Sequence, residues 1–201
     1  MGGGFGGKET QAAQWACIAA LLASRNQCAV KLRLPRFTDM HVTGKRHPFE
    51  NEFDVAFDET GKIEATRMTI NGICGHSPDL SDAIVDRAMF HADNGYFLGD
   101  SDIVGHRLQT NMVSHTAYRG FGGPQGMIMA EAIIDKIARA IGSDPLSVRK
   151  RNLYGPTTGS LTPYGMKVEH NLLPDMIAEL EETAQYWQRR EAIAAFNRES
   201  P

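Results

Sequence analysis

The chain has 201 residues, of which 42% are hydrophobic, and a formal charge of −3. This length fits one large domain or two small ones, and the dispersed Lys and Arg residues form no basic stripe of the kind that binds nucleic acid. No apolar run approaches the length of a membrane span, and the glycine-rich start lacks the regions of a signal peptide, so we expect a cytoplasmic protein.

The first segment, MGGGFGG, allows two interpretations: a flexible linker, or a loop whose N–H groups wrap a cofactor. Residues 8–25 contain neither Gly nor Pro and place apolar residues near helical spacing, which predicts a helix with Glu9 in its first turn. A glycine loop that opens onto a helix N-terminus suits an anion or the polar edge of a cofactor. Taken alone, Glu9 is best interpreted as an exposed carboxylate favoured by the helix dipole.

Strands are expected after this helix. Residues 28–36 alternate apolar and basic side chains, which predicts a half-buried strand ended by Pro35. Residues 53–73 contain two alternating runs around Glu59-Thr60-Gly61, which predicts a hairpin. The three cysteines, Cys17, Cys28 and Cys74, have no CxxC or Cys/His ligand spacing, so we expect reduced, buried thiols and neither an iron–sulfur cluster nor zinc.

A helix is predicted over residues 77–95, with Ser77 as its N-cap and Asn94-Gly95 at its end. On this helix Arg87 shares a stripe with Leu80, Ile84 and His91.

Arg87 has no acidic residue three or four positions away to form a local ion pair. If the stripe faces inward, the guanidinium needs a distant carboxylate or an anionic ligand. The alternative is an arginine whose stem packs while its head reaches solvent.

In the second half of the chain, the pattern predicts a strand at 103–113 and a helix at 124–142. A short helix capped by Ser143 or Asp144 follows, and one or two amphipathic helices are predicted from Pro174 onward. We therefore expect one α+β region over 1–201, a mixed sheet with packed helices, with 143–201 as a possible helical C-terminal segment.

A second glycine cluster, SHTAYRGFGGPQG, holds Arg119 and Phe121 and again opens onto a helix. A phenylalanine flanked by glycines is either a core anchor or a ring held over a flat ligand.

Six segments occur in the order found in one enzyme family: MGGGFGGKE, TGKRHPF, DLSDAIVDRAMFHADN, TAYRGFGGPQG, RKRNLY and FNRES. The whole chain thereby resembles the molybdenum-cofactor-binding part of the xanthine dehydrogenase and aldehyde oxidase family. The resemblance implies part of a molybdopterin-binding domain in an enzyme that oxidises hypoxanthine or xanthine to urate with oxygen from water.

The resemblance also implies roles for individual residues. Gly4, Phe5, Gly6 and Arg119 match positions beside the molybdenum and its pterin, and no side chain of the chain ligates the metal. For substrate, Phe121 matches the ring that stacks on a purine, Glu9 and Arg87 match the pair that grips its polar edge, and Leu80 matches an entrance residue.

Further parts of such an enzyme are implied as partners: the remainder of the molybdenum-binding domain, and the 2Fe-2S and FAD domains or subunits. The matched segment stops short of the family's general base, so we expect a fragment that is inactive and free of molybdenum when alone. Two alternatives are an aldehyde-oxidase-type enzyme for another N-heterocycle and a non-catalytic scaffold that retains these loops.

Overall fold

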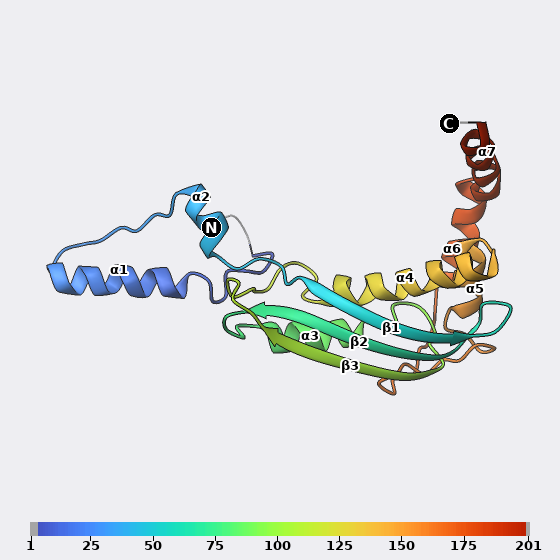
Figure 1. Ribbon diagram of the computed structural model, residues 1–201, viewed down its shortest axis with the longest axis horizontal. Helices are drawn as coiled ribbons and strands as arrows, with labels where there is room; N and C mark the ends of the chain where they lie inside the picture. The colour runs from blue at the N-terminus through green and yellow to red at the C-terminus, as the bar shows by residue number, and fades with distance from the viewer. Residues whose placement is uncertain (1–3, 200–201) are drawn as a thin grey trace.

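The computed structural model describes residues 4–199, which form a central sheet-and-helix body with a helical projection at each end (Figure 1). In chain order its elements are α1 (Ala13–Asn26), α2 (Arg36–Val42), β1 (Phe49–Phe57), β2 (Ile63–Gly75), α3 (Ser81–Phe90), β3 (Asp100–Gln109), α4 (Gly123–Ile141), α5 (Pro145–Asn152), α6 (Leu173–Thr183) and α7 (Tyr186–Glu199). None of the described helices is both long and apolar enough to cross a membrane.

The sheet has the order β1-β2-β3. β1 and β2 form the expected antiparallel hairpin, whose turn is held by Asp58, since its carboxylate accepts the N–H groups of Thr60 and Lys62. β3 runs parallel to β2 because α3 forms the crossover between them. The expected α+β class with a mixed sheet is confirmed.

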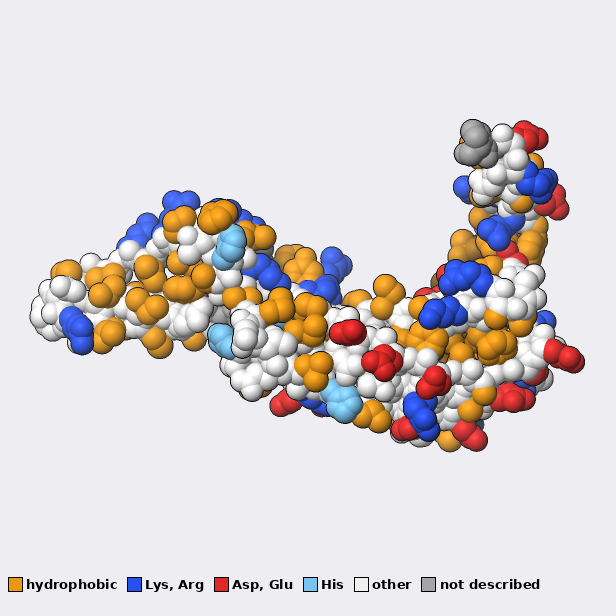
Figure 2. Space-filling model, in the orientation of Figure 1, with side chains coloured by type: hydrophobic (Ala, Val, Ile, Leu, Met, Phe, Trp, Pro, Cys, Tyr) orange, Lys and Arg blue, Asp and Glu red, His pale blue; other side chains and the backbone are white. Residues whose placement is uncertain are grey.

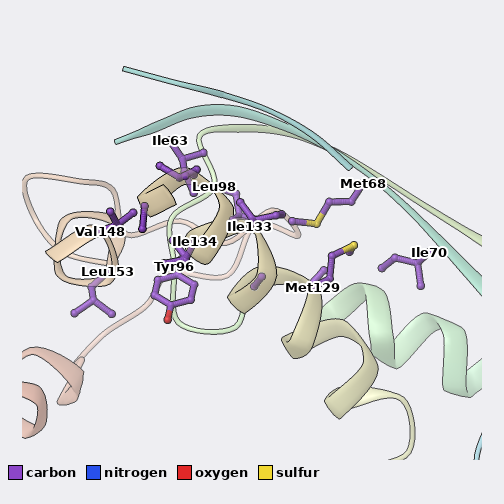
Figure 3. Packing of buried hydrophobic residues seen from close by; sticks show 14 of the residues in the cluster. Ile63, Met68, Ile70, Tyr96, Leu98, Met129, Ile133, Ile134, Val148 and Leu153 are labelled. Carbon is purple, nitrogen blue, oxygen red and sulfur yellow. The ribbon is translucent and has the colours of Figure 1, made fainter. Parts of the chain in front are cut away.

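The hydrophobic core lies between this sheet and α4 (Figure 3). The buried face of α4 carries Met129, Ile133 and Ile137 at helical spacing, and β2 contributes Met68 and Ile70 to the core. Burial of each such side chain contributes about 1.5–3 kcal/mol before entropy is subtracted. The core therefore fixes α4, and with it the glycine segment that precedes the helix.

α3 and α4 cross at very short range. A Cβ on Gly122 would lie 2.0 Å from the carbonyl oxygen of Ile84, and one on Gly126 would lie 2.1 Å from that of Ala88. No side chain fits at either position, so these two glycines are required by contact between the two helices.

Asn152, in the segment RKRNLY, holds the β1–β2 turn from the end of α5. Its side chain is fully buried, accepts the N–H of Ile63 at 2.8 Å, and donates to the carbonyls of Gly61 and Val148 at 2.8 and 2.9 Å. This explains an asparagine at a position that burial alone would assign to an apolar residue.

The two projections expose much apolar surface. Neither α1 nor the α6–α7 pair has a buried residue, and Figure 2 shows hydrophobic side chains over α1 and near α6. The larger exposed side chains are Ile18, Leu21 and Leu22 on α1 and Met176, Leu180, Ile193 and Phe196 on α6–α7. Apolar surface of this extent is typical of an interface.

Several expectations about the first half of the chain were wrong. Residues 28–35 are extended but pair with no described strand, and residues 36–42 form the unexpected helix α2. α1 begins at Ala13, so Glu9 precedes the helix. Cys17 and Cys28 are exposed, and only Cys74 is buried.

The start of α3 also differs from the prediction. The helix begins at Ser81 after a turn that places Asp79 at φ 44°, and the Ser77 hydroxyl hydrogen-bonds to that of Ser114 at 2.7 Å instead of capping the helix. Segments 124–142, 143–152 and 174–199 form helices as expected.

Candidate functional site

The two glycine segments meet at one end of the central body. Gly6 lies against the second segment so closely that a Cβ would come within 3.0 Å of the carbonyl carbon and oxygen of Ala117. Gly6 and Gly7 have φ of 84° and 79°, and Gly120 and Gly122 have φ of 93° and 95°. The first segment thus contacts the second through Gly6 and Gly7, while Gly2 and Gly3 lie outside the described residues.

Gly4 differs from Gly6 in what surrounds it. A Cβ on Gly4 would meet nothing within 4 Å, and the neighbouring Phe5 ring is 64% exposed with φ 51°. The contacts within the chain therefore explain the glycine at position 6 but not the one at position 4.

A strap of four residues, Gly44–His47, joins the parts of this junction. The Gly44 N–H donates to the Gln11 side chain at 2.7 Å, and the Lys45 carbonyl accepts the N–H of Thr116 at 3.0 Å.

The second half of the strap reaches the other glycine segment and α3. The Arg46 guanidinium donates to the Arg119 carbonyl at 2.7 Å and lies 4.5 Å from the Tyr118 ring centroid. His47 Nε2 and the Ser81 hydroxyl share a hydrogen bond of 2.7 Å.

Two histidines lie buried beneath this junction. The rings of His47 and His115 are 5.8 Å apart. Burial, reinforced by the nearby His115, lowers the pKa of His47 from 6.5 to about 4, and burial also lowers the pKa of His115. Both rings are therefore neutral at pH 7.

Buried polar atoms without a hydrogen-bond partner among the described residues collect around the same junction. They include Thr10 Oγ1, Arg46 Nη1, His47 Nδ1, Asp79 Oδ2, both ring nitrogens of His115, Thr116 Oγ1 and Gln125 Oε1. Both donors and acceptors are present, so the junction has unused capacity to bind a polar group.

The predicted substrate residues stand apart from the buried core. Glu9 is exposed, and its carboxylate accepts the Lys8 N–H at 3.0 Å. Arg87 is also exposed, which agrees with the alternative of an arginine whose head reaches solvent, while α3 buries Ser81, Ile84, Val85 and Ala88. The Arg87 Nε donates to His91 at 3.4 Å, and no acidic side chain among residues 4–199 forms an ion pair with it.

The remaining predicted residues lie in the second glycine segment and at the start of α3. Phe121 is half-buried at φ 50°, Arg119 is exposed beside it, and Leu80 is half-buried directly before α3. A separate cavity of about 320 Å³ between α3, β3 and Tyr164 is lined by none of the predicted residues.

Comparison with known proteins identifies the family. Residues 1–153 match the family model of the molybdopterin cofactor-binding domain. The chain belongs to this family.

Molybdopterin-binding proteins of two kinds are similar to the chain. It is 38% identical over 200 residues to xanthine dehydrogenase of Dictyostelium discoideum and 40% identical to xanthine dehydrogenase/oxidase of Gallus gallus, covering all of this chain and 15% of each relative. Among solved structures, aldehyde oxidoreductase from Desulfovibrio gigas superimposes with a TM-score of 0.80 at 30% identity, over 92% of this chain and 20% of that one. The chain thus corresponds to a minor part of these relatives.

The junction fits the cofactor that the family name implies. Molybdopterin carries a flat, polar heterocycle, and such a group needs close backbone approach and many hydrogen bonds. Gly4 leaves its backbone open, and Thr10 Oγ1, Thr116 Oγ1 and Gln125 Oε1 are buried polar atoms of the junction without a partner among the described residues. Among the described residues no group of three His, Cys, Asp or Glu side chains could hold a metal ion.

The residues of the strap were missed by sequence reasoning. The segment TGKRHPF contributed to the resemblance, but its order gave no indication that Arg46 and His47 contact residues more than 30 positions away. The one available signal was an arginine and a histidine in a short segment between Gly44 and Pro48.

Proposed function

We propose that the chain is the part of a molybdenum hydroxylase that holds one side of the cofactor and one side of a purine such as hypoxanthine or xanthine. The observation that carries this proposal is the junction itself, where Gly6 and Gly7 lie against Ala117 and where buried polar atoms such as Thr116 Oγ1 lack partners among the described residues. The identity to xanthine dehydrogenases supports it.

The cofactor side is assigned to Gly4, Phe5, Gly6 and Arg119. Gly4 leaves its backbone uncovered, Gly6 holds the loop against Ala117, and Arg119 adds a permanent positive charge for an acidic or carbonyl group. When bound, the molybdenum cofactor supplies the oxidation chemistry, and this chain supplies orientation and charge.

The substrate side is assigned to Glu9, Arg87, Phe121 and Leu80. A purine presents N–H donors and carbonyl acceptors along its edges, which match a carboxylate acceptor and a guanidinium donor. The Arg87 Nε is occupied by His91, whereas the two terminal nitrogens make no hydrogen bond to any other described residue and can donate to a substrate. Phe121 offers a ring face for stacking, and Leu80 borders the entrance.

Further parts of the enzyme complete the proposed site. We assign the rest of the cofactor contacts to the remainder of the molybdenum-binding domain and the exit of electrons to iron–sulfur and FAD parts. The purified 201-residue chain is then inactive, because a cofactor held from one side only loses most of its contacts.

The test compares two variants in the molybdenum-loaded enzyme that contains this chain. Glu9→Gln and Arg87→Met should each lower kcat/KM for xanthine by about 10²-fold or more, since each removes a charged contact to the substrate. Arg67→Met is the matched control, because Arg67 is an exposed arginine on the sheet, 3.5 Å from Asp102. Unchanged xanthine oxidation in both variants would refute the substrate assignment.

The metal content of the chain alone tests the remaining claim. We expect no stoichiometric molybdenum and no urate formation with an artificial electron acceptor. Stoichiometric metal together with urate formation would contradict the inactivity.

A further inference from the structure

Three features of Arg46 at the junction are not explained by any role predicted from the sequence. One terminal nitrogen donates to the Arg119 carbonyl at 2.7 Å, the guanidinium carbon Cζ lies over the Tyr118 ring at 4.5 Å from its centroid, and the other terminal nitrogen, Nη1, is buried without a partner among the described residues. A lysine could not make the first two contacts together, because they need a planar group with several donors.

The contacts of Arg46 fall on the turn that carries Arg119 and Phe121. This turn is stabilised by few hydrogen bonds of its own: Phe121 N–H donates to the Tyr118 carbonyl at 2.8 Å, and Gly123 N–H donates to the Gly120 carbonyl at 2.9 Å. Residues 118–120 are exposed, so burial does little to fix them. The contacts with Arg46 therefore restrain a turn that has few hydrogen bonds of its own.

The chain on both sides of Arg46 is held by hydrogen bonds. The preceding carbonyl of Lys45 accepts from Thr116, and the following residue, His47, is 3% exposed and bonded to Ser81 of α3. The His47 carbonyl also accepts from the Gln125 side chain of α4 at 3.4 Å. Arg46 thus projects from a backbone anchored on both sides.

We propose that Arg46 is a positioning residue that fixes the turn carrying Arg119 and Phe121, and so sets where these side chains meet the cofactor and the purine. The second half of this statement rests on the proposed function; the first half concerns the chain alone. The charge-assisted bond to the Arg119 carbonyl orients that peptide, and the cation–π contact with the Tyr118 ring restrains outward movement of the turn.

Amide hydrogen exchange in the 201-residue chain, without cofactor, tests the positioning. In Arg46→Met the amides of Phe121 and Gly123 should exchange about tenfold faster, or more, relative to the amide of the core residue Ile133. Arg46→Lys should show an intermediate increase, since it keeps one donor but not the planar group. Arg33 is an exposed arginine before α2, so Arg33→Met is the matched control. It should leave the exchange rates of both amides unchanged.

The reference amide separates local from global effects. If Arg46→Met also speeds exchange of the Ile133 amide, the substitution has destabilised the chain as a whole. The test then rests on the exchange rates measured in Arg46→Lys. Relative exchange at Phe121 and Gly123 within about twofold of the wild type, in whichever variant keeps Ile133 protected, would overturn the proposal.

Molybdopterin content of the loaded enzyme provides the second readout. A reduced content in Arg46→Met together with faster exchange supports both halves of the proposal. Faster exchange with unchanged content leaves Arg46 as a positioning residue and instead refutes the assignment of Arg119 to the cofactor.

Discussion

Gly6 lies against the backbone of Ala117, 111 positions further along the chain, at a distance that leaves no room for a side chain. Gly4, two residues away, has no neighbour within 4 Å of where a Cβ would stand. The two glycines therefore respond to different constraints.

We expect Gly6→Ala to affect stability and Gly4→Ala to affect cofactor binding. At position 6, alanine must leave φ 84° or displace Ala117, at a cost of about 1–2 kcal/mol in the stability of the junction. At position 4, alanine should leave the melting temperature unchanged but reduce molybdopterin content of the loaded enzyme. A Gly4→Ala protein with full cofactor content would contradict the cofactor assignment of this loop.

His47 makes the stability of the chain depend on pH. Its pKa is about 4 when folded and 6.5 when unfolded, so the unfolded chain binds more protons between these values and stability is lost as the pH falls through this window. The pKa difference corresponds to at most about 3 kcal/mol.

Urea unfolding of the wild type and of His47→Gln at pH 7 and pH 4.5 measures this effect. Glutamine keeps hydrogen-bonding capacity without titrating, so the loss on acidification should shrink in the variant. His106→Gln, at an exposed position, is the control. An equal loss of stability in wild type and His47→Gln would show that other groups cause it, with His115 as the first candidate because burial also lowers its pKa.

Asn152→Ala should destabilise the chain by about 3 kcal/mol, because it leaves the buried Ile63 N–H and the Gly61 carbonyl without partners. Chemical denaturation gives the value, with Asn111→Ala at an exposed position for comparison. The assignment of Asn152 as the anchor of the β1–β2 turn fails if the two variants unfold at the same denaturant concentration.

Gly126→Ala should cost about 1–3 kcal/mol by forcing α3 and α4 apart. The added methyl would stand 2.1 Å from the carbonyl oxygen of Ala88. Ala132→Ser on the exposed side of α4 serves as control, and a melting temperature equal to that control would mean that the helices can separate freely.

The sequence predicted best where local signals coincide with burial. α4 combines helical apolar spacing with glycines at both ends, and Asp144 caps α5 by accepting the Leu146 N–H at 2.8 Å, so both helices were found. The alternation at residues 28–36 led to a wrong strand prediction. A period of two shows that a segment can be extended, but not that a neighbouring strand exists to pair with it.

The site was predictable in composition but not in geometry. Glycine clusters and an unpaired Arg87 were visible in the sequence, whereas the burial of His47 against Ser81 depends on residues 34 positions apart. The parallel pairing of β2 and β3 likewise depends on the crossover through α3. Periodicity describes one element at a time, so contacts between distant elements escape it.

At the junction, the Gln11 side chain donates to the Ser114 carbonyl across 103 residues, whereas the β1–β2 hairpin closes across a few. Closing so long a loop costs more chain entropy than closing a hairpin, so we expect the junction to form last, after the sheet and α4 have assembled. A late-forming junction would leave the glycine segments open during folding, and the proposed cofactor could enter before the strap locks the turn in place.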